Sequence, residues 1–293
     1  MKPAPFEYHA PDTLEQAVAL LGEYGFGAKL LAGGQSLIPT MNFRLAQPAV
    51  LIDLNGIEDL AYVREDGEAG LRVGAMTRQR AVERSALVAA RAPLLFETMP
   101  WIAHPQIRNR GTIGGSIAHA DPAAELPAVM LALEADLALR GPSGTRTVPA
   151  SEFFTGLFGT AMAPDEILTD ARIPPLPGRS GAAFLEIARR HGDYALAGVA
   201  AVLSLDGDGR CNRARVALFS VSDGPVLSAA AAGALEGRAP DPDAVREAAK
   251  ATAADLDPPT DIHASAAYRR HLARHLTERA LRTAAERAAA AGA

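Results

Sequence analysis

A run of prolines divides this chain of 293 residues into two parts. The segment Pro174-Pro175-Leu176-Pro177-Gly178 contains three prolines and a glycine. Proline fixes φ and lacks a backbone N–H donor, so neither a helix nor a strand can continue through this segment. We therefore predict a domain boundary here, with residues 1–176 on one side and residues 177–293 on the other. With 48% hydrophobic residues, the chain can bury the cores of two or three lobes.

Hydrophobic periodicity predicts a mixture of helices and strands along both parts. Asp12 reads as the N-cap of a helix that ends near Gly22 or Gly25. We also expect a strand over residues 29–32, just before Gly33. Further strands are predicted at 49–54, 71–75, 136–140, 145–148, 182–188, 198–205 and 214–221, and further helices from Thr77 and at 126–135, 227–235, 243–254 and 265–290.

Glycine pairs mark the first segment with a possible chemical role, Ala32-Gly33-Gly34-Gln35-Ser36-Leu37. Two glycines allow positive φ and a close approach of the backbone to a ligand. The N–H groups that follow can point at a phosphate, and Gln35 and Ser36 add side-chain donors. Taken alone, a Gly-Gly pair is equally compatible with an ordinary turn.

A second segment of similar composition follows Asn109. It reads Gly111-Thr112-Ile113-Gly114-Gly115-Ser116 and precedes Ala118-His119-Ala120-Asp121-Pro122. Two such loops in one domain could hold the two ends of a pyrophosphate through backbone N–H groups, without many lysines or arginines. The pair of segments is therefore more informative than either segment alone.

Composition excludes several function classes. The net charge of −5 gives no basic surface of the kind that binds nucleic acid. The single cysteine, Cys211, rules out an internal disulfide and argues against an iron–sulfur cluster or a cysteine-rich zinc site in this chain. The first ten residues do not read as a signal peptide, and no apolar run predicts a transmembrane helix. We expect a cytoplasmic protein.

The two glycine segments together carry a resemblance. The stretches 32–39 and 111–122 resemble the FAD-binding medium subunit of the molybdenum hydroxylases, a family that includes aerobic carbon monoxide dehydrogenases and enzymes of the xanthine dehydrogenase type. Similarity extends to residues 1–8, 165–168, 189–195 and 264–270, and so to nearly the whole chain. It implies an α+β fold: a two-lobed FAD-binding domain of the PCMH or vanillyl-alcohol-oxidase type, with lobes of about 1–56 and 57–176, followed by a C-terminal sheet-and-helix domain, residues 177–293.

The resemblance also implies roles for individual residues. The pyrophosphate and ribityl chain of a non-covalently bound FAD would lie against Ala32, Gly33, Gly34, Gln35, Ser36, Leu37, Thr112, Ile113, Gly114, Gly115 and Ser116. Glu125 stands where the family has an acidic residue near the flavin, the backbone of Leu168 would contact the ring, and Tyr194 would lie over its face. In one departure, Glu186 stands where related chains often carry a lysine.

Two further residues keep alternatives open. His119 either lies near the flavin or satisfies a loop carbonyl, and Asp121 is either an acceptor in the ligand loop or a helix N-cap. No pair of residues shows the spacing of a metal site, and the sequence offers no obvious acid–base pair.

The function implied by the resemblance is electron transfer. A molybdenum subunit would oxidise the substrate, two [2Fe–2S] clusters in a small subunit would relay electrons, and the FAD of this chain would pass them to an acceptor. The complex is expected to be a dimer of heterotrimers, and the arginines beyond His263 are either a solvated helix face or a docking surface. Two alternatives are a free-standing FAD oxidoreductase and a docking subunit without flavin.

Overall fold

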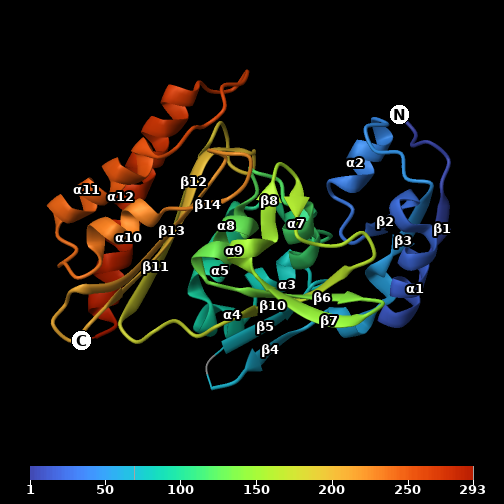
Figure 1. The fold of residues 1–293 in the computed structure, drawn as a ribbon, viewed down its shortest axis with the longest axis horizontal. Coiled ribbons are helices and arrows are strands. Elements are labelled where there is room, and N and C mark those ends of the chain that lie inside the picture. Colours follow the sequence, from blue (N-terminus) through green and yellow to red (C-terminus); the bar gives the residue numbers. More distant parts are fainter. Residues whose placement is uncertain (69, 293) are drawn as a thin grey trace.

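The computed structural model describes residues 1–68 and 70–292. Three main sheets follow one another along the chain, with helices around them (Figure 1). This arrangement confirms the predicted α+β fold. Residues 174–179 contain no helix or strand, as the prolines predict, whereas the division into domains at Leu176 stays a prediction.

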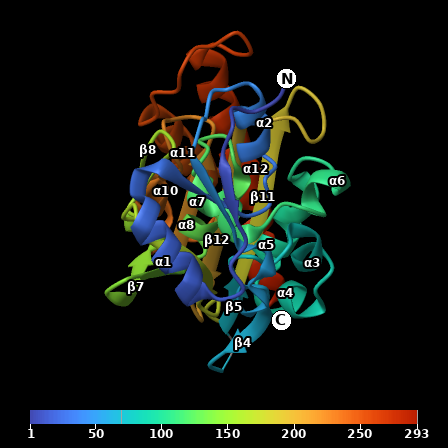
Figure 2. The same ribbon diagram turned by 90° about the vertical axis from the view of Figure 1, so that its right-hand side faces the viewer.

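The N-terminal sheet is parallel, in the order β1-β3-β2. Its elements are β1 (Glu7–His9), α1 (Leu14–Tyr24), β2 (Ala28–Leu31), α2 (Leu37–Asn42) and β3 (Val50–Asp53). The N-cap of α1 is Thr13, whose hydroxyl accepts from the Gln16 N–H, so the prediction of Asp12 was wrong by one residue. Gly25 ends the helix with φ +51°, as predicted. Both α2 and the N-terminus lie at the same end of the molecule in two perpendicular views (Figure 1, Figure 2).

The middle sheet is antiparallel and has the order β4-β5-β10-β6-β7. Its strands are β4 (Val63–Asp66), β5 (Gly70–Gly74), β6 (Asp136–Gly141), β7 (Gly144–Pro149) and β10 (Ile167–Ile173), and a small hairpin follows with β8 (Phe154–Gly156) and β9 (Gly159–Thr160). The helices are α3 (Gln79–Glu83), α4 (Ala86–Arg91), α5 (Pro93–Thr98), α6 (Pro105–Arg108), α7 (Ile113–His119), α8 (Glu125–Ala132) and α9 (Ala150–Phe153).

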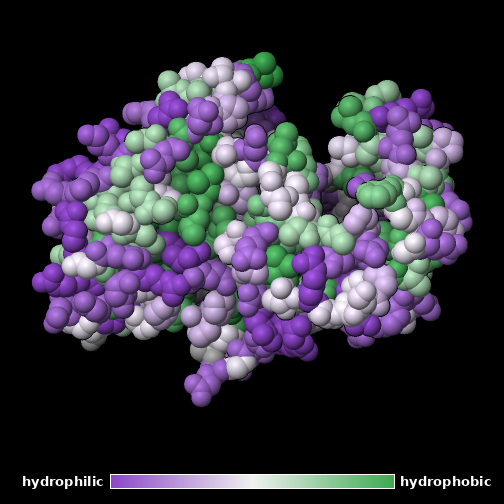
Figure 3. Space-filling model, viewed as in Figure 1, coloured by the Kyte–Doolittle hydropathy of each residue, from purple (hydrophilic) through white to green (hydrophobic). Residues whose placement is uncertain are grey.

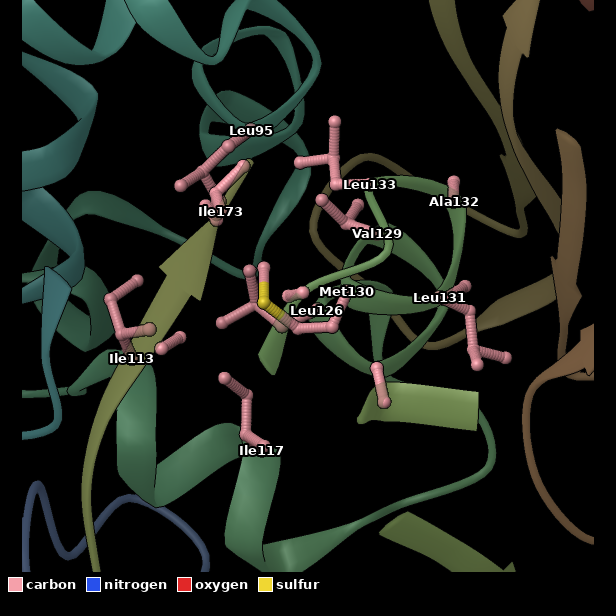
Figure 4. Close-up of a cluster of buried hydrophobic side chains, with 14 of the residues drawn as sticks. Leu95, Ile113, Ile117, Leu126, Val129, Met130, Leu131, Ala132, Leu133 and Ile173 are labelled. Atoms are coloured by element: carbon pink, nitrogen blue, oxygen red, sulfur yellow. The ribbon is translucent and has the colours of Figure 1, made fainter. Parts of the chain in front are cut away.

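Helix α8 occupies the centre of the largest core. All eight of its residues are buried, which explains its uninterrupted apolar sequence after Glu125. Ile113 and Ile117 of α7 point toward Leu126 and Met130 of α8 (Figure 4). The isoleucines lie four residues apart and therefore on one face of α7. This packing fixes α7 against the protein interior.

The C-terminal sheet is antiparallel and has helices on both faces. Its elements are β11 (Ser180–Ala188), β12 (Ala195–Leu205), β13 (Cys211–Phe219), β14 (Val226–Leu227), α10 (Ala229–Leu235), α11 (Pro242–Ala254) and α12 (Ala266–Ala290). Phe184 and Phe219 face the core around α8, whereas Val199 and Leu218 face the three C-terminal helices. Every residue of β12 is buried because the strand is central and covered on both faces.

Candidate functional site

The first glycine segment is a loop with unused backbone donors. Gly34 has φ +72°, and the Gln35 side-chain amide donates to the Gly33 carbonyl over 3.0 Å, which braces the turn. Within residues 1–68 and 70–292, the N–H groups of the four consecutive residues from Gly33 to Ser36 donate to no protein acceptor. Gly33 is buried and the other three residues are half-buried. Four adjacent free donors are the arrangement by which a backbone nest binds an anion, and the binding of a phosphate at this loop stays a prediction.

The second glycine segment is not a loop, so the prediction of a second turn of the same character was wrong. Residues from Ile113 onward form α7, and Thr112 is its N-cap, with its hydroxyl accepting from the Gly115 N–H over 3.0 Å. The Gly114 N–H donates to the Ala75 carbonyl over 2.8 Å, and the Ile113 N–H to that of Thr77 over 3.0 Å. Most donors of this segment are therefore satisfied by the protein itself.

The two segments pack directly against each other. A Cβ on Gly33 would lie 2.6 Å from the Arg110 carbonyl oxygen and 2.7 Å from the Gly111 Cα. A Cβ on Gly115 would lie 2.7 Å from the Thr112 hydroxyl and 3.2 Å from the Ala32 Cβ. The glycines at 33 and 115 are thus required for contact between two stretches of chain. Only Gly34 is required for positive φ.

Two side chains that the sequence did not single out connect the segments. The Asn55 amide donates to the Ala32 carbonyl over 2.9 Å, while its oxygen accepts from Arg78 over 2.6 Å. Arg78 also donates to the Arg110 carbonyl over 2.5 Å. The parallel pairing of β2 and β3 could have pointed to Asn55, because the residues that follow two parallel strands lie at the same edge of the sheet. Asn55 follows β3 and Ala32 follows β2 in this way.

A group of acidic residues lies beyond the C-terminal end of α7. Burial raises the pKa of Glu125 to about 7, and Asp121 raises it further. Burial likewise raises the pKa of Glu186 to about 8, with Glu125 contributing, and one Glu186 carboxylate oxygen is buried without a hydrogen-bond partner. The Tyr194 hydroxyl has a raised pKa through burial of its polar end and the charges of Asp121 and Glu125, although 65% of the residue surface is exposed. Four predicted or singled-out residues from distant parts of the sequence therefore lie in one region.

His119 and Asp121 occupy the connection between α7 and α8. The His119 ring lies 5.1 Å from that of Phe158, centroid to centroid. Asp121 accepts from the Ala123 N–H over 2.9 Å, but the N-cap position of α8 is held by Ala124, so the N-cap alternative for Asp121 was wrong. The Ser220 N–H donates to the Pro122 carbonyl over 2.7 Å, which fixes this turn to the end of β13.

The surface is hollowed between the N-terminal region and the middle of the molecule (Figure 3). The side chain of Leu168 is buried in the core. This residue lies on β10, at a point where the pairing of β10 with β6 is irregular. Two other open hollows of about 380 Å³ flank α1 and are lined by residues such as Val18 and Leu20, and neither contains a predicted site residue. Among the described residues no group of three His, Cys, Asp or Glu side chains could hold a metal ion.

Comparison with known proteins assigns the two parts of the chain. Residues 4–176 match the FAD binding domain in molybdopterin dehydrogenase, and residues 182–284 match the CO dehydrogenase flavoprotein C-terminal domain. The chain belongs to this family of flavoprotein subunits. It is a component of a molybdenum-dependent oxidoreductase, which confirms the family that the glycine segments indicated.

Individual relatives match over almost their whole length. The carbon monoxide dehydrogenase medium chain of Hydrogenophaga pseudoflava is 43% identical over 99% of this chain and 100% of its own. The alpha subunit of the 6-hydroxypseudooxynicotine dehydrogenase complex of Paenarthrobacter nicotinovorans is 42% identical over 98% and 97%. A structure of the Hydrogenophaga pseudoflava carbon monoxide dehydrogenase superposes with a TM-score of 0.95 at 44% identity, covering 98% of this chain and 99% of that one. These relatives are thus subunits of multisubunit enzymes. No described helix of this chain is long and apolar enough to cross a membrane.

Proposed function

We propose that the junction of the two glycine segments holds the FAD pyrophosphate. The observation that carries this proposal is the run of free N–H groups from Gly33 to Ser36, because a diphosphate is the FAD group that such donors suit. Ala32 and Leu37 border the run. The second segment, comprising Thr112, Ile113, Gly114, Gly115 and Ser116, contributes mainly the wall against which the loop packs.

We place the flavin end of FAD toward the acidic residues. Helix α7 leads from the glycine junction to His119 and Asp121, a length of about 10 Å at the usual rise per residue. Glu125, the backbone of Leu168 and the exposed Tyr194 would then surround the ring. When bound, FAD supplies the electron-transfer chemistry, and the residues of this chain bind it, orient it and set its electrostatic surroundings.

Glu186 would give this site an unusual charge. A lysine at this position would favour an electron-rich flavin, whereas a buried carboxyl near Glu125 disfavours added negative charge. One oxygen of the carboxyl has no hydrogen-bond partner among the described residues. Because its pKa is raised to about 8, the carboxyl is mostly protonated near neutral pH and gains its negative charge only as the pH rises through 8. We expect the flavin of this protein to be harder to reduce at high pH than at low pH.

We propose that the chain passes electrons within a complex that contains an iron–sulfur subunit with [2Fe–2S] clusters and a molybdenum subunit, assembled as a dimer of heterotrimers in the cytoplasm. Support comes from relatives that are medium chains of such enzymes. These relatives act on substrates as different as carbon monoxide and 6-hydroxypseudooxynicotine, so the substrate would be decided by another subunit. Residues 1–176 and 177–293 are proposed as its two domains.

Only some of the arginines of α12 are available to form a docking surface. Arg269 is buried and donates to the Leu196 carbonyl and to Asp261, while Arg287 pairs with Glu97. The remaining exposed arginines without an ion pair among the described residues are Arg274, Arg279 and Arg282. We propose these three as the cationic face that meets an acidic partner surface.

Two experiments test the proposed function. The full chain reconstituted with FAD should be yellow and should quench flavin fluorescence, and failure of both would exclude a flavoprotein subunit. Native purification of the tagged chain should recover additional subunits together with iron and molybdenum. Recovery of a monomer that turns over a substrate without either metal would favour the free-standing oxidoreductase instead.

A further inference from the structure

The structure places a cation without a direct ion pair among the described residues between the two glycine segments. The Arg78 guanidinium makes only two hydrogen bonds to the described residues, and both acceptors are neutral oxygens, those of Arg110 and Asn55. No carboxylate of the described residues forms an ion pair with it. Burial and the neighbouring Arg110 lower its pKa, but an arginine remains protonated under all ordinary conditions. The Asp53 carboxylate raises that pKa from a distance but does not contact the guanidinium, so the half-buried positive charge has no direct ion pair among the described residues.

The same guanidinium determines how the segments are spaced. One of its nitrogens reaches the Arg110 carbonyl, which is also the atom closest to Gly33. Another nitrogen reaches Asn55, which in turn holds the Ala32 carbonyl. Both carbonyls immediately precede glycines of the segments. Removing the guanidinium would thus release both sides of the junction at once.

Asn55 is itself held rigidly. Its backbone N–H donates to the Asp53 carboxylate over 2.9 Å, its side-chain amide lies against the same carboxylate, and Tyr8 donates to the other Asp53 oxygen over 2.6 Å. The chain of contacts from Tyr8 to Arg78 therefore connects all three parallel-sheet strands or their ends to Arg110, just before α7. A side chain held in this way loses little entropy when a ligand binds beside it.

We infer that Arg78, held by Asn55, is a positioning residue of the proposed FAD site: it fixes the two glycine segments at the separation that exposes the four N–H donors, and its charge, which has no direct ion pair among the described residues, attracts the diphosphate. This inference rests on the proposed function. It explains how an anion of two charges could bind where the segments themselves contribute only neutral donors. Charge-assisted hydrogen bonds are about twice as strong as neutral ones.

Titration of the apo-protein with FAD and with riboflavin, which lacks the diphosphate, tests this inference. In Arg78→Met we expect the Kd for FAD to rise about 10- to 100-fold, as for the loss of one charged interaction, while the Kd for riboflavin changes less than about twofold. The FAD affinity of the wild type should fall with added salt, and more steeply than that of the variant. Arg246→Met, at an exposed position on α11, is the matched control and should bind FAD as the wild type does.

Three outcomes separate the possibilities. If the wild type binds FAD and Arg78→Met binds it equally well, the inference is overturned while the proposed function stands. If the wild type does not bind FAD, the proposed function itself fails. If Arg78→Met does not fold, Arg78→Lys decides: lysine keeps the charge but lacks the forked geometry, so we expect a several-fold weaker Kd with the salt dependence retained. Wild-type affinity in a folded Arg78→Lys would overturn the positioning role.

Discussion

The two glycine-rich segments have similar residues but different structural roles. In residues 33–36 the backbone turns through a positive φ at Gly34 and leaves its donors free. In residues 113–116 the backbone starts a helix and directs its donors to Ala75, Thr77 and Thr112. The first segment thus leaves donors available for the proposed ligand, whereas the second uses its donors within the protein. A Gly-Gly pair therefore indicates close approach, without saying to what.

The largest effect is expected from Gly114→Val. A Cβ at this position would lie 2.3 Å from the Ala75 Cβ and 2.7 Å from its Cα, neither of which can move without shifting β5 and α7 apart. We expect a loss of roughly 3 kcal/mol or more in the free energy of unfolding, seen as a lower Tm, with flavin lost as a consequence.

Gly22→Val is the matched control for that substitution. A Cβ at Gly22 meets nothing within 4 Å, so the variant should differ from the wild type by less than about 0.5 kcal/mol. Unfolding of Gly114→Val at the wild-type Tm would contradict the close packing of α7.

Gly33→Val should affect binding more than folding. Its Cβ would meet the Arg110 oxygen and the Gly111 Cα, so the loop must lift from the second segment and move its N–H groups. We expect FAD affinity to fall by about 100-fold, corresponding to two lost bonds to a charged phosphate, and stability by about 2 kcal/mol. Gly27→Val, where a Cβ meets nothing within 4 Å, is the control. Equal flavin occupancy in both variants would sink the assignment of the loop.

Glu186→Gln should change the pH dependence of the free energy of unfolding and leave the packing of the two glycine segments unchanged. Because the pKa values of Glu125 and Glu186 are raised from 4.5 to about 7 and about 8, the folded apo-protein binds more protons than the unfolded chain between these values. Their contribution to stability is fully present below pH 4.5 and is lost as the pH rises through 7 and 8.

The glutamine cannot ionise, so the variant should be more stable than the wild type at pH 9 by something on the order of 2 kcal/mol, with a flatter profile in urea melts. Glu23→Gln, on the exposed side of α1, should leave the profile unchanged. Identical slopes for wild type and Glu186→Gln would contradict a raised pKa at this buried carboxyl.

The smallest effect is expected from Gly34→Ala. The added methyl group would lie 3.1 Å from the Ile38 Cγ1 and 3.2 Å from the Leu31 Cδ1, so these two side chains must shift slightly. In addition, a φ of +72° costs an alanine about 1 kcal/mol. We expect a fall of about 1 kcal/mol in stability and a few-fold weaker FAD binding. Gly207→Ala, in open space without a positive φ, should show neither change.

The sequence by itself determined the family, the fold class and the longer helices and strands, but it missed short elements such as β1 and α2 and read the start of α7 as a loop. The strand before Gly33, the hairpin after β6, the three C-terminal helices and the irregular proline segment follow from local periodicity and turn chemistry, which depend on neighbouring residues. The resemblance indicated the family, because two glycine segments at a fixed separation can be recognised from the residues alone, without knowledge of their contacts.

Only the tertiary structure decided what each site residue touches. Thr112 was read as part of a loop because Gly-Gly disfavours helix, yet burial of Ile113 and Ile117 against α8 outweighs the cost of two glycines in the first turn. The contacts through which Arg78 and Asn55 connect the glycine segments carry no local signal, since they join residues 23 or more positions apart. The absence of a direct ion pair at Arg78 and the unpartnered oxygen of Glu186 depend on which groups folding brings together among the described residues, and no single segment of sequence contains that information.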